Sequence, residues 1–355
     1  MASALNLGDM LQGRGRLCEA QALYQEAVAA CQRAGSAGGG AVEQGLEAAL
    51  ALERVQQALG GGGLGQQGSS GSAREPLACS FAVALTPGRA WHLLSRPSAM
   101  ARVRRGSFAV LAQMKNEAMG LREWLAHYTW QGADAILLLD NGSSDDWRGI
   151  VADFPAAVVL PAPERYAQPF NLGEIGRPWL EERGYEYVLV TDLDNFFWSE
   201  RRGKSMKDLV LETQDAEGGA AQFTCPYHHF GSSGYDRQPP SIRECLVRRS
   251  AVTSEVRFGS SVVRLQSLLR IHGEVQTVQG RTVACPPGLL NFHYKAQSRE
   301  YWEKVKLPRG DAQSEKDNGY RTWQQFELED RTGNATEDTR LRDALRSAGF
   351  ALTSC

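Results

Sequence analysis

Several features are missing from this 355-residue chain, and each absence excludes a class of protein. Lys and Arg number 39 against 41 Asp and Glu, so no positive excess is present to bind a nucleic-acid backbone. No apolar run approaches the roughly 18 residues of a membrane span. No apolar stretch follows a basic N-terminus, as it does in a secretory signal. We therefore expect neither a nucleic-acid partner nor a membrane span.

The cysteines also lack a pattern. Seven of them are scattered along the chain, with no CxxC pair and no regular spacing. An odd, irregular set is typical of reduced structural thiols rather than of a disulfide framework. Without a secretory signal, this set predicts a cytoplasmic protein. The alternative is the Golgi or another secretory compartment, if an anchor has been removed.

Glycine gathers in two N-terminal stretches, 35–40 and 60–71, which predict loops or linkers. Apolar residues at spacings of three and four predict helices up to residue 59, and the first pair resembles one tetratricopeptide repeat. A generic helical hairpin is the alternative. These helices could bind a protein partner or a second copy of the chain. We expect a helical appendage, a glycine-rich linker and a main domain, at 1–59, 60–75 and 76–345.

From residue 107 onward, apolar strands alternate with amphipathic helices, which predicts an α/β fold with a mostly parallel sheet. Ligands of such sheets bind beyond the carboxyl ends of the strands. Acidic segments follow three of the expected strands and would meet at that edge. The strands are expected at 107–113, 135–139, 156–160 and 185–191, the helices at 121–128 and 172–183, and the acidic segments at 115–117, 140–146 and 192–194.

Two carboxylates directly follow the fourth expected strand. In an extended segment, Asp192 and Asp194 would point the same way because side chains alternate. Such a pair suits Mg²⁺ or Mn²⁺, which can bridge phosphate oxygens. Asp140 ends the second strand before a tight turn at Gly142, where a carboxylate can accept hydrogen bonds from a nucleoside. A surface loop that carries acids by chance is the alternative for both segments.

Taken together, the motifs resemble those of glycosyltransferase families 2 and 92. The resemblance runs from about residue 107 to 338 and implies a GT-A fold, in which a Rossmann-like nucleotide half is fused to an acceptor half. Each motif is moderately specific, and it is their common order that favours the family. The motifs are Met114–Glu117, Leu139–Asp146, Thr191–Phe197, Phe230–Gly234 and Asn291–Lys295.

The resemblance also implies roles for individual residues. A nucleotide sugar, most often a UDP-sugar, would bind together with Mn²⁺ or Mg²⁺. The implied metal ligands are Asp192, Asp194 and His293, the last of which could instead be a core histidine. The implied nucleotide-sugar contacts are Lys115, Asn116, Glu117, Asp140, Asn141, Gly142, Ser143, Asp192, Leu193, Lys295 and Arg309. The implied acceptor contacts are Tyr227, His229, Phe230, Gly231, Ser232, Ser233 and Gly234.

The reaction expected from this resemblance is metal-dependent transfer of a sugar to a hydroxyl of a glycan, a protein or a small molecule. The resemblance favours galactose as the sugar and inversion as the stereochemical outcome. Inversion needs a carboxylate to take the proton of the acceptor hydroxyl. Asp236 is the first candidate and Glu244 the second, with a structural role as the alternative for each.

Two other functions would share part of this pattern. A phosphatase of the haloacid dehalogenase type also has a DxD after an apolar strand, but its nucleophile lies on the first strand and Asp192 follows the fourth. A degenerate transferase fold could instead serve as a non-catalytic adaptor that binds a sugar nucleotide or a protein. The complete DxD motif and His293 favour the enzyme.

Overall fold

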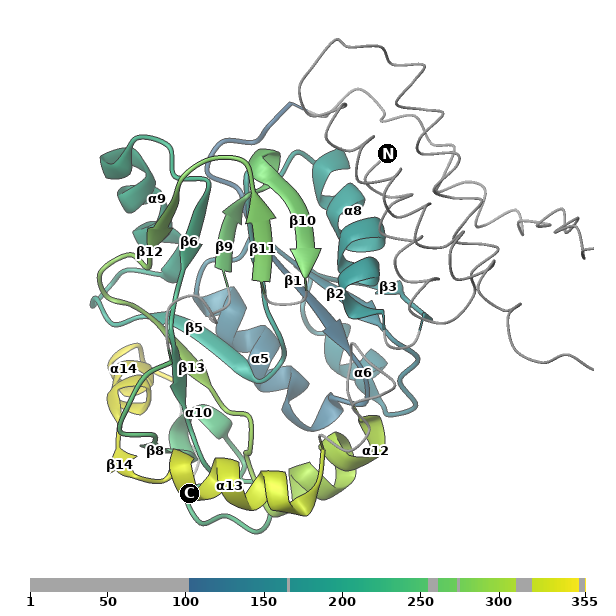
Figure 1. The fold of residues 1–355 in the computed structure, drawn as a ribbon, viewed down its shortest axis with the longest axis vertical. Coiled ribbons are helices and arrows are strands. Elements are labelled where there is room, and N and C mark those ends of the chain that lie inside the picture. Colours follow the sequence, from purple (N-terminus) through teal and green to yellow (C-terminus); the bar gives the residue numbers. More distant parts are fainter. Residues whose placement is uncertain (1–101, 165–166, 255–260, 273–274, 311–320, 351–354) are drawn as a thin grey trace, which may run out of the picture. The chain divides into compact units, whose positions relative to one another are not determined.

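The computed structural model describes residues 102–164, 167–254, 261–272, 275–310, 321–350 and 355 (Figure 1). The expected N-terminal helices, the glycine-rich linker and the start of the main domain lie outside these residues. Within the described part, no helix is long and apolar enough to cross a bilayer.

A seven-stranded sheet forms the centre of the described domain (Figure 1). Its strands are β12 (Thr282–Ala284), β6 (Gln222–Thr224), β9 (Ser261–Arg264), β4 (Tyr187–Val190), β1 (Phe108–Met114), β2 (Ala135–Asp140) and β3 (Ala157–Pro161), in that order across the sheet. Among these strands, β9 runs antiparallel to both of its neighbours, while the other pairings are parallel. The predicted α/β class with a mostly parallel sheet is therefore confirmed.

The alternating side chains of the central strands build two cores, one on each face of the sheet. Phe108 and Val110 of β1 pack on one face, against Trp124 and other side chains of helix α5 (Ala118–Trp130). Ala109 and Leu111 pack on the other face. Because both faces are covered, these strands are continuous apolar runs, which made them predictable from the sequence.

The second face is covered by a helix in three parts. It begins as α7 (Gln168–Asn171), continues as the π-helix η1 (Leu172–Gly176) and ends as α8 (Arg177–Glu182). At Gly176 the backbone approaches β1 so closely that a Cβ atom would lie 2.6 Å from Leu111 Cδ1. A larger residue at this position would therefore force the buried Leu111 side chain to shift.

A second, three-stranded sheet extends the domain beyond the carboxyl edge of the first. It consists of β5 (Asn195–Ser199), β13 (Leu289–His293) and β7 (Tyr227–His229), with β13 in the middle. Two small sheets complete the strands: β10 (Leu268–His272) with β11 (Val275–Val278), and β14 (Thr336–Glu337) with β8 (Arg248–Arg249).

The remaining helices are α6 (Trp147–Val151), α9 (Met206–Glu217), α10 (Ile242–Cys245), η3 (Leu265–Ser267), α11 (Arg299–Tyr301), η4 (Trp302–Lys306), α12 (Leu307–Arg309), α13 (Trp323–Gly333) and α14 (Arg340–Ser347). The last helix ends two residues beyond the expected domain boundary.

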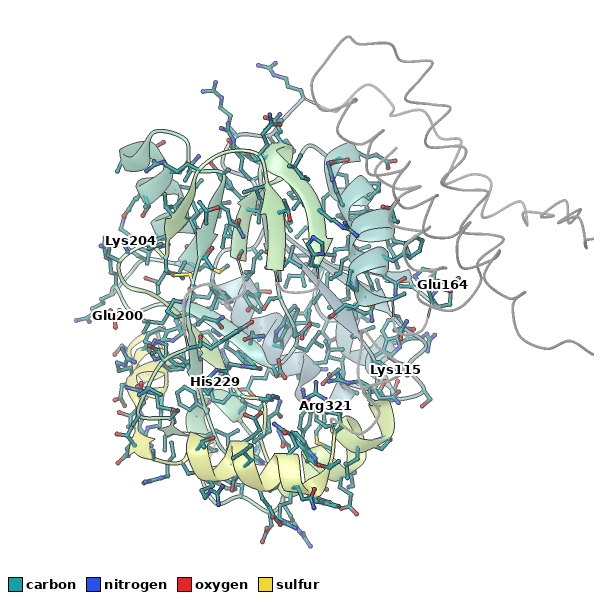
Figure 2. All side chains as sticks on the ribbon, viewed as in Figure 1. Lys115, Glu164, Glu200, Lys204, His229 and Arg321 are labelled. Carbon is teal, nitrogen blue, oxygen red and sulfur yellow. A yellow bond between two sulfur atoms is a disulfide. The ribbon has the colours of Figure 1, made fainter. Side chains whose placement is uncertain are left out.

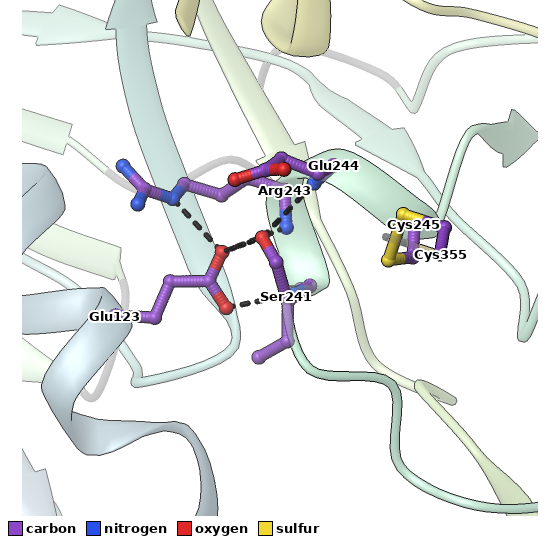
Figure 3. Close-up of a disulfide and its surroundings, with 7 residues drawn as sticks. Glu123, Ser241, Arg243, Glu244, Cys245 and Cys355 are labelled. Atoms are coloured by element: carbon purple, nitrogen blue, oxygen red, sulfur yellow. Dashed lines mark hydrogen bonds and ion pairs between the residues drawn. A yellow bond between two sulfur atoms is a disulfide. The ribbon is translucent and has the colours of Figure 1, made fainter. Parts of the chain in front are cut away.

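The expectation that the cysteines are reduced thiols is wrong for four of the seven. Cys225 is bonded to Cys285, and Cys245 to Cys355 (Figure 3). The partners are 60 and 110 residues apart in sequence, with Cα atoms 4.7 and 5.4 Å apart. Scattered spacing misled the prediction because tertiary folding, not local sequence, brings these thiols together.

Candidate functional site

Three carboxylates gather at the carboxyl edge of the central sheet. Glu117 follows β1, and Asp192 and Asp194 follow β4, its neighbour in the sheet. The predicted DxD position after the fourth strand is therefore confirmed. Its conformation differs from the expectation, because the segment is a turn in which the Asn195 amide donates to the Asp192 carbonyl at 3.2 Å. The two carboxylates still lie close enough for Asp194 to raise the pKa of Asp192.

Asp194 is the most heavily engaged of the three. Its Oδ2 accepts a hydrogen bond from Lys306 Nζ at 2.6 Å, and its Oδ1 lies 3.4 Å from His293 Nε2. The side chains of Lys306 and Asp194 are only 2% and 6% exposed. Burial alone would raise the pKa of Asp194, but the Lys306 ammonium and His293 hold it well below the usual value.

Asp192 lies in a different environment although it is two residues away. Its Oδ1 accepts from Gln168 Nε2 at 2.8 Å. Burial raises the pKa of Asp192, and the negative charge of Asp194 raises it further. The pair therefore has one carboxylate that is firmly ionised and one whose charge is disfavoured.

Glu117 forms a second buried ion pair beside the first. It pairs with the guanidinium of Arg309, and its Oε2 accepts from Tyr301 Oη at 2.8 Å. Burial acts against the charge of Arg309, but Glu117 and the two DxD aspartates raise its pKa above the usual value. The three carboxylates of the sheet edge thus all favour the charged form of Arg309.

The cations come from a single continuous helical segment, α11–η4–α12. Ser298 caps its start, accepting from the Tyr301 amide at 3.0 Å. Tyr301, Lys306 and Arg309 of this segment all contact carboxylates of the sheet edge. Of these residues, Arg309 is predicted from the sequence, whereas Lys306, Tyr301 and Gln168 are not. The spacing of three between Lys306 and Arg309, which places them on one helical face, was the signal available for Lys306.

By its chemistry, the predicted metal-ligand set fits a hard divalent cation. Asp192, Asp194 and His293 offer carboxylate oxygens and one imidazole, which Mn²⁺ accepts. Among the described residues, however, no three His, Cys, Asp or Glu side chains are grouped so as to hold a metal ion. At Asp194, Lys306 takes one oxygen, while His293, itself one of the predicted ligands, faces the other.

Hydrogen bonds made by its own side chains hold the predicted nucleoside-binding loop in place. Asp140 Oδ1 accepts from the Ser143 amide at 2.8 Å, and Ser143 Oγ accepts from the Asn116 amide at 3.0 Å. Asn141 Nδ2 donates to the carbonyls of Ala162 and Glu164 at 2.6 and 2.8 Å. Gly142 has a φ of 79°, as the tight turn requires. These hydrogen bonds shape the edge of the site.

Two histidines meet beside the aspartates. His293 Nδ1 lies 3.2 Å from His229 Nδ1, and the Tyr227 ring lies against both imidazoles. Burial and the neighbouring His293 lower the pKa of His229 to about 4, so it is neutral at pH 7. His228 points to the opposite face of β7, toward Phe292. Within this pair of adjacent histidines, His229 is therefore the one that lies beside His293.

The predicted acceptor loop is built around a helix end. The Gly231 amide donates to the Gly333 carbonyl at 2.9 Å, and a Cβ atom on Gly333 would lie 2.5 Å from Gly231 N. The amides of Ser232 and Ser233 donate to Asp330 and Asn334 at the end of α13. The small residues of this loop are therefore explained by contact with α13, while Phe230 is buried in the core.

The remaining predicted residues are scattered. Lys295 Nζ pairs with Glu329 at 2.5 Å, and Leu193 is part of the core. Asp236 is exposed and its carbonyl accepts from the Glu300 amide, whereas Glu244 is buried in α10 beside the Cys245–Cys355 disulfide (Figure 3). Lys115 is half-buried in the loop after β1 (Figure 2).

Comparison with known sequences identifies relatives of one kind. Two matches carry the same description, a glycosyltransferase family 92 protein of Ricinus communis, and are 23% identical over 143 residues and 26% identical over 160 residues. The matches cover 37% and 39% of this chain, and they span about a quarter of the relatives' length (24% and 26%). No protein-family model matches the chain.

Comparison with solved structures gives distant similarities. TarS of S. aureus (residues 1–349) is 13% identical with a TM-score of 0.35, and covers 63% of this chain and 70% of its own. Glucosyl-3-phosphoglycerate synthase of Mycobacterium tuberculosis, solved with Mn²⁺ and UDP-glucose, is 14% identical with a TM-score of 0.28, covering 46% and 57%. HddC of Yersinia pseudotuberculosis is 9% identical with a TM-score of 0.31, covering 56% and 97%.

Proposed function

We propose that this protein is a glycosyltransferase of the GT-A type, which transfers a sugar from a nucleotide diphosphate sugar to a hydroxyl acceptor. The observation that carries the proposal is the cluster of buried, oppositely charged side chains at the carboxyl edge of a mostly parallel sheet, which is the usual ligand position in such sheets. The sequence similarity to family 92 glycosyltransferases supports the same activity.

The charges suit a donor that leaves as a diphosphate. In glycosyl transfer, negative charge builds on the leaving phosphate as the bond to the sugar breaks. Lys306 and Arg309 lie on one helical segment at the sheet edge, and Arg321 lies near enough to lower the pKa of Lys306 (Figure 2). These cations would bind and orient the diphosphate and stabilise its charge as the sugar departs.

We further propose that the site binds a divalent ion, Mn²⁺ or Mg²⁺. The donor would be a UDP-sugar, with galactose as the sugar, and the reaction would proceed with inversion. Asp192, Asp194 and His293 are the residues that would hold the ion. When bound, the ion would supply additional positive charge to the leaving diphosphate. The acceptor would lie on the side of Tyr227 and His229, where aromatic and imidazole rings offer a surface for a sugar or another hydroxyl compound.

The test is a panel of nucleotide sugars, measured by thermal shift and calorimetry with Mn²⁺ present, followed by a transfer assay with the donor that binds. Asp192→Asn is expected to weaken donor binding by about tenfold or more, because it removes a carboxylate of the site. Asp153→Asn is the matched control, since Asp153 forms an exposed surface pair with Arg122.

The outcomes separate the candidate functions. Donor binding with transfer supports the enzyme, and donor binding without transfer to any acceptor supports the adaptor. If no nucleotide sugar binds, or if Asp192→Asn and Asp153→Asn behave alike, the proposed donor site is wrong.

A further inference from the structure

Lys306 and a divalent cation would need the same carboxylate. Lys306 Nζ lies 2.6 Å from Asp194 Oδ2, and both side chains are almost completely buried. His293 faces the other oxygen at 3.4 Å. A metal ion could therefore bind Oδ2 only if the ammonium moved away, and a metal ion at Oδ1 would be repelled by the ammonium held on the same buried carboxylate.

The charge of the cluster shows when that move would be favourable. Among the described residues of the sheet edge, the carboxylates of Asp192, Asp194 and Glu117 lie near the cations Lys306, Arg309 and Arg321. A divalent cation alone would add two positive charges beside these cations, and a diphosphate alone would add negative charge beside the carboxylates. Added net charge is costly in a buried site. The two ligands together add less net charge than either alone, because their charges are opposite in sign.

The helical segment can release Lys306 without leaving the sheet edge. Tyr301 and Arg309, on either side of Lys306, are both held by Glu117. The main chain therefore stays anchored while the long, flexible Lys306 side chain changes partner. Its stem has four rotatable carbons, which is enough to move an ammonium by several ångströms.

We propose that Lys306 is an internal counter-ion that competes with a divalent metal for Asp194, and that the diphosphate of a bound nucleotide draws Lys306 away and opens Asp194 to the metal. The inference deepens the proposed function and depends on it for the nucleotide step.

The first experiment measures Mn²⁺ affinity by electron paramagnetic resonance on the full chain, without any nucleotide. Lys306→Met keeps the length of the side chain and removes its charge. It is expected to bind Mn²⁺ at least about tenfold more tightly than the wild type, because one repelling charge is gone. Lys304→Met is the matched control, since Lys304 is exposed and pairs with Glu300. It is expected to leave Mn²⁺ affinity unchanged.

The second experiment adds UDP and corrects for the binding of Mn²⁺ to free UDP. In the wild type, UDP is expected to tighten Mn²⁺ binding by at least about tenfold, and in Lys306→Met by clearly less. Equal Mn²⁺ affinity in the wild type and Lys306→Met, measured without UDP, would overturn the competition. Equal enhancement by UDP in the two proteins would overturn the release step.

Circular dichroism and the melting temperature show whether Lys306→Met is folded. If it is not, the wild-type measurement decides, because tight Mn²⁺ binding without UDP contradicts a carboxylate blocked by Lys306. Failure of UDP to bind to any of the proteins refutes a UDP-sugar as the donor of the proposed function. The competition at Asp194 is still tested in that case by Mn²⁺ alone, so the two failures are distinguishable.

Discussion

Tyr301 donates its phenolic hydrogen to Glu117 Oε2 at 2.8 Å, and this bond joins positions 184 residues apart in the sequence. Both side chains are buried. Because Arg309 pairs with the same carboxylate, Glu117 fixes the helical segment that carries Lys306 at two points. The position of Lys306 beside Asp194 therefore does not depend on the Lys306–Asp194 ion pair alone.

Removing the Tyr301 hydroxyl should weaken this anchor. Tyr301→Phe deletes a buried hydrogen bond to a carboxylate, and we expect a loss of about 1 to 3 kcal/mol in the free energy of unfolding. Urea denaturation measures the change. Tyr235→Phe, on a half-buried ring outside the anchor, should change the free energy by less. Equal unfolding midpoints for wild type and Tyr301→Phe would show that the hydroxyl contributes nothing.

Replacing each of the two DxD aspartates by asparagine should affect the stability of the protein differently. Asp194→Asn leaves the buried Lys306 ammonium without its carboxylate, which we expect to cost about 3 to 5 kcal/mol of stability. Asp192→Asn removes a charge that burial and Asp194 disfavour, so its effect should be close to zero or stabilising. Chemical denaturation of the two variants at pH 7 makes the comparison. Similar losses in both would contradict the assignment of Lys306 to Asp194.

The sequence was sufficient for the parts of the fold that depend on local pattern. The first four strands are apolar runs because both faces of the sheet are covered, and α5 shows its buried stripe at Leu121, Trp124, Leu125 and Tyr128. The acidic positions at the strand ends followed from the order of strands and helices. These features need no knowledge of distant contacts.

The partners of the site residues could not be predicted in the same way. Lys306 lies 112 residues from Asp194, and Gln168 lies 24 residues from Asp192. No local pattern in either neighbourhood specifies such pairs, because the folded backbone creates them. The same holds for the disulfides. A motif can therefore locate a site, while its charge balance depends on tertiary structure.

Asp338 should make stability depend on pH in the acid range. Burial alone would raise its pKa, but hydrogen bonds from Arg340 and Arg249 lower the pKa to about 2. Since the folded pKa lies below the unfolded value of about 4, the stabilisation is complete above pH 4 and is lost as the pH falls toward 2. It should amount to about 2 kcal/mol at neutral pH.

Denaturation of wild type and Asp338→Asn between pH 7 and pH 2 tests this. Their difference in unfolding free energy should be constant down to about pH 4 and shrink below it. Asp153→Asn, at an exposed pair, should show no such trend. A constant difference over the whole range would contradict the lowered pKa.

The two disulfides should be reduced in a fixed order. Cys355 is exposed at the chain end, whereas Cys225 is completely buried. Thiol attack requires access to a sulfur atom, so increasing dithiothreitol should open Cys245–Cys355 before Cys225–Cys285. Alkylation at each concentration, followed by peptide mass spectrometry, identifies the pair that opens first. Simultaneous opening would mean that global unfolding, rather than access, limits the reduction.

Glu123, whose side chain is 15% exposed, should be a key structural carboxylate of α5. Its Oε1 accepts from Ser241 Oγ at 2.6 Å and from Arg243 Nε at 2.9 Å, and its Oε2 accepts from the Ile242 amide at 2.7 Å (Figure 3). These bonds join α5 to the start of α10. Because the Arg243 side chain is only 7% exposed, removing the carboxylate leaves a buried guanidinium unpaired.

We therefore expect Glu123→Ala to lower the free energy of unfolding by about 3 to 5 kcal/mol. Glu123→Gln keeps one accepting oxygen and should cost less. Glu181→Gln is the control, since Glu181 pairs with Arg177 one helical turn away and is half-exposed, so its loss should stay below about 1 kcal/mol. Denaturant titrations of the three variants measure how much free energy of unfolding each of them loses. If Glu123→Ala is no more destabilising than Glu181→Gln, the contact between α5 and α10 is not held by this carboxylate, and the packing of Ile242 in the core must hold it instead.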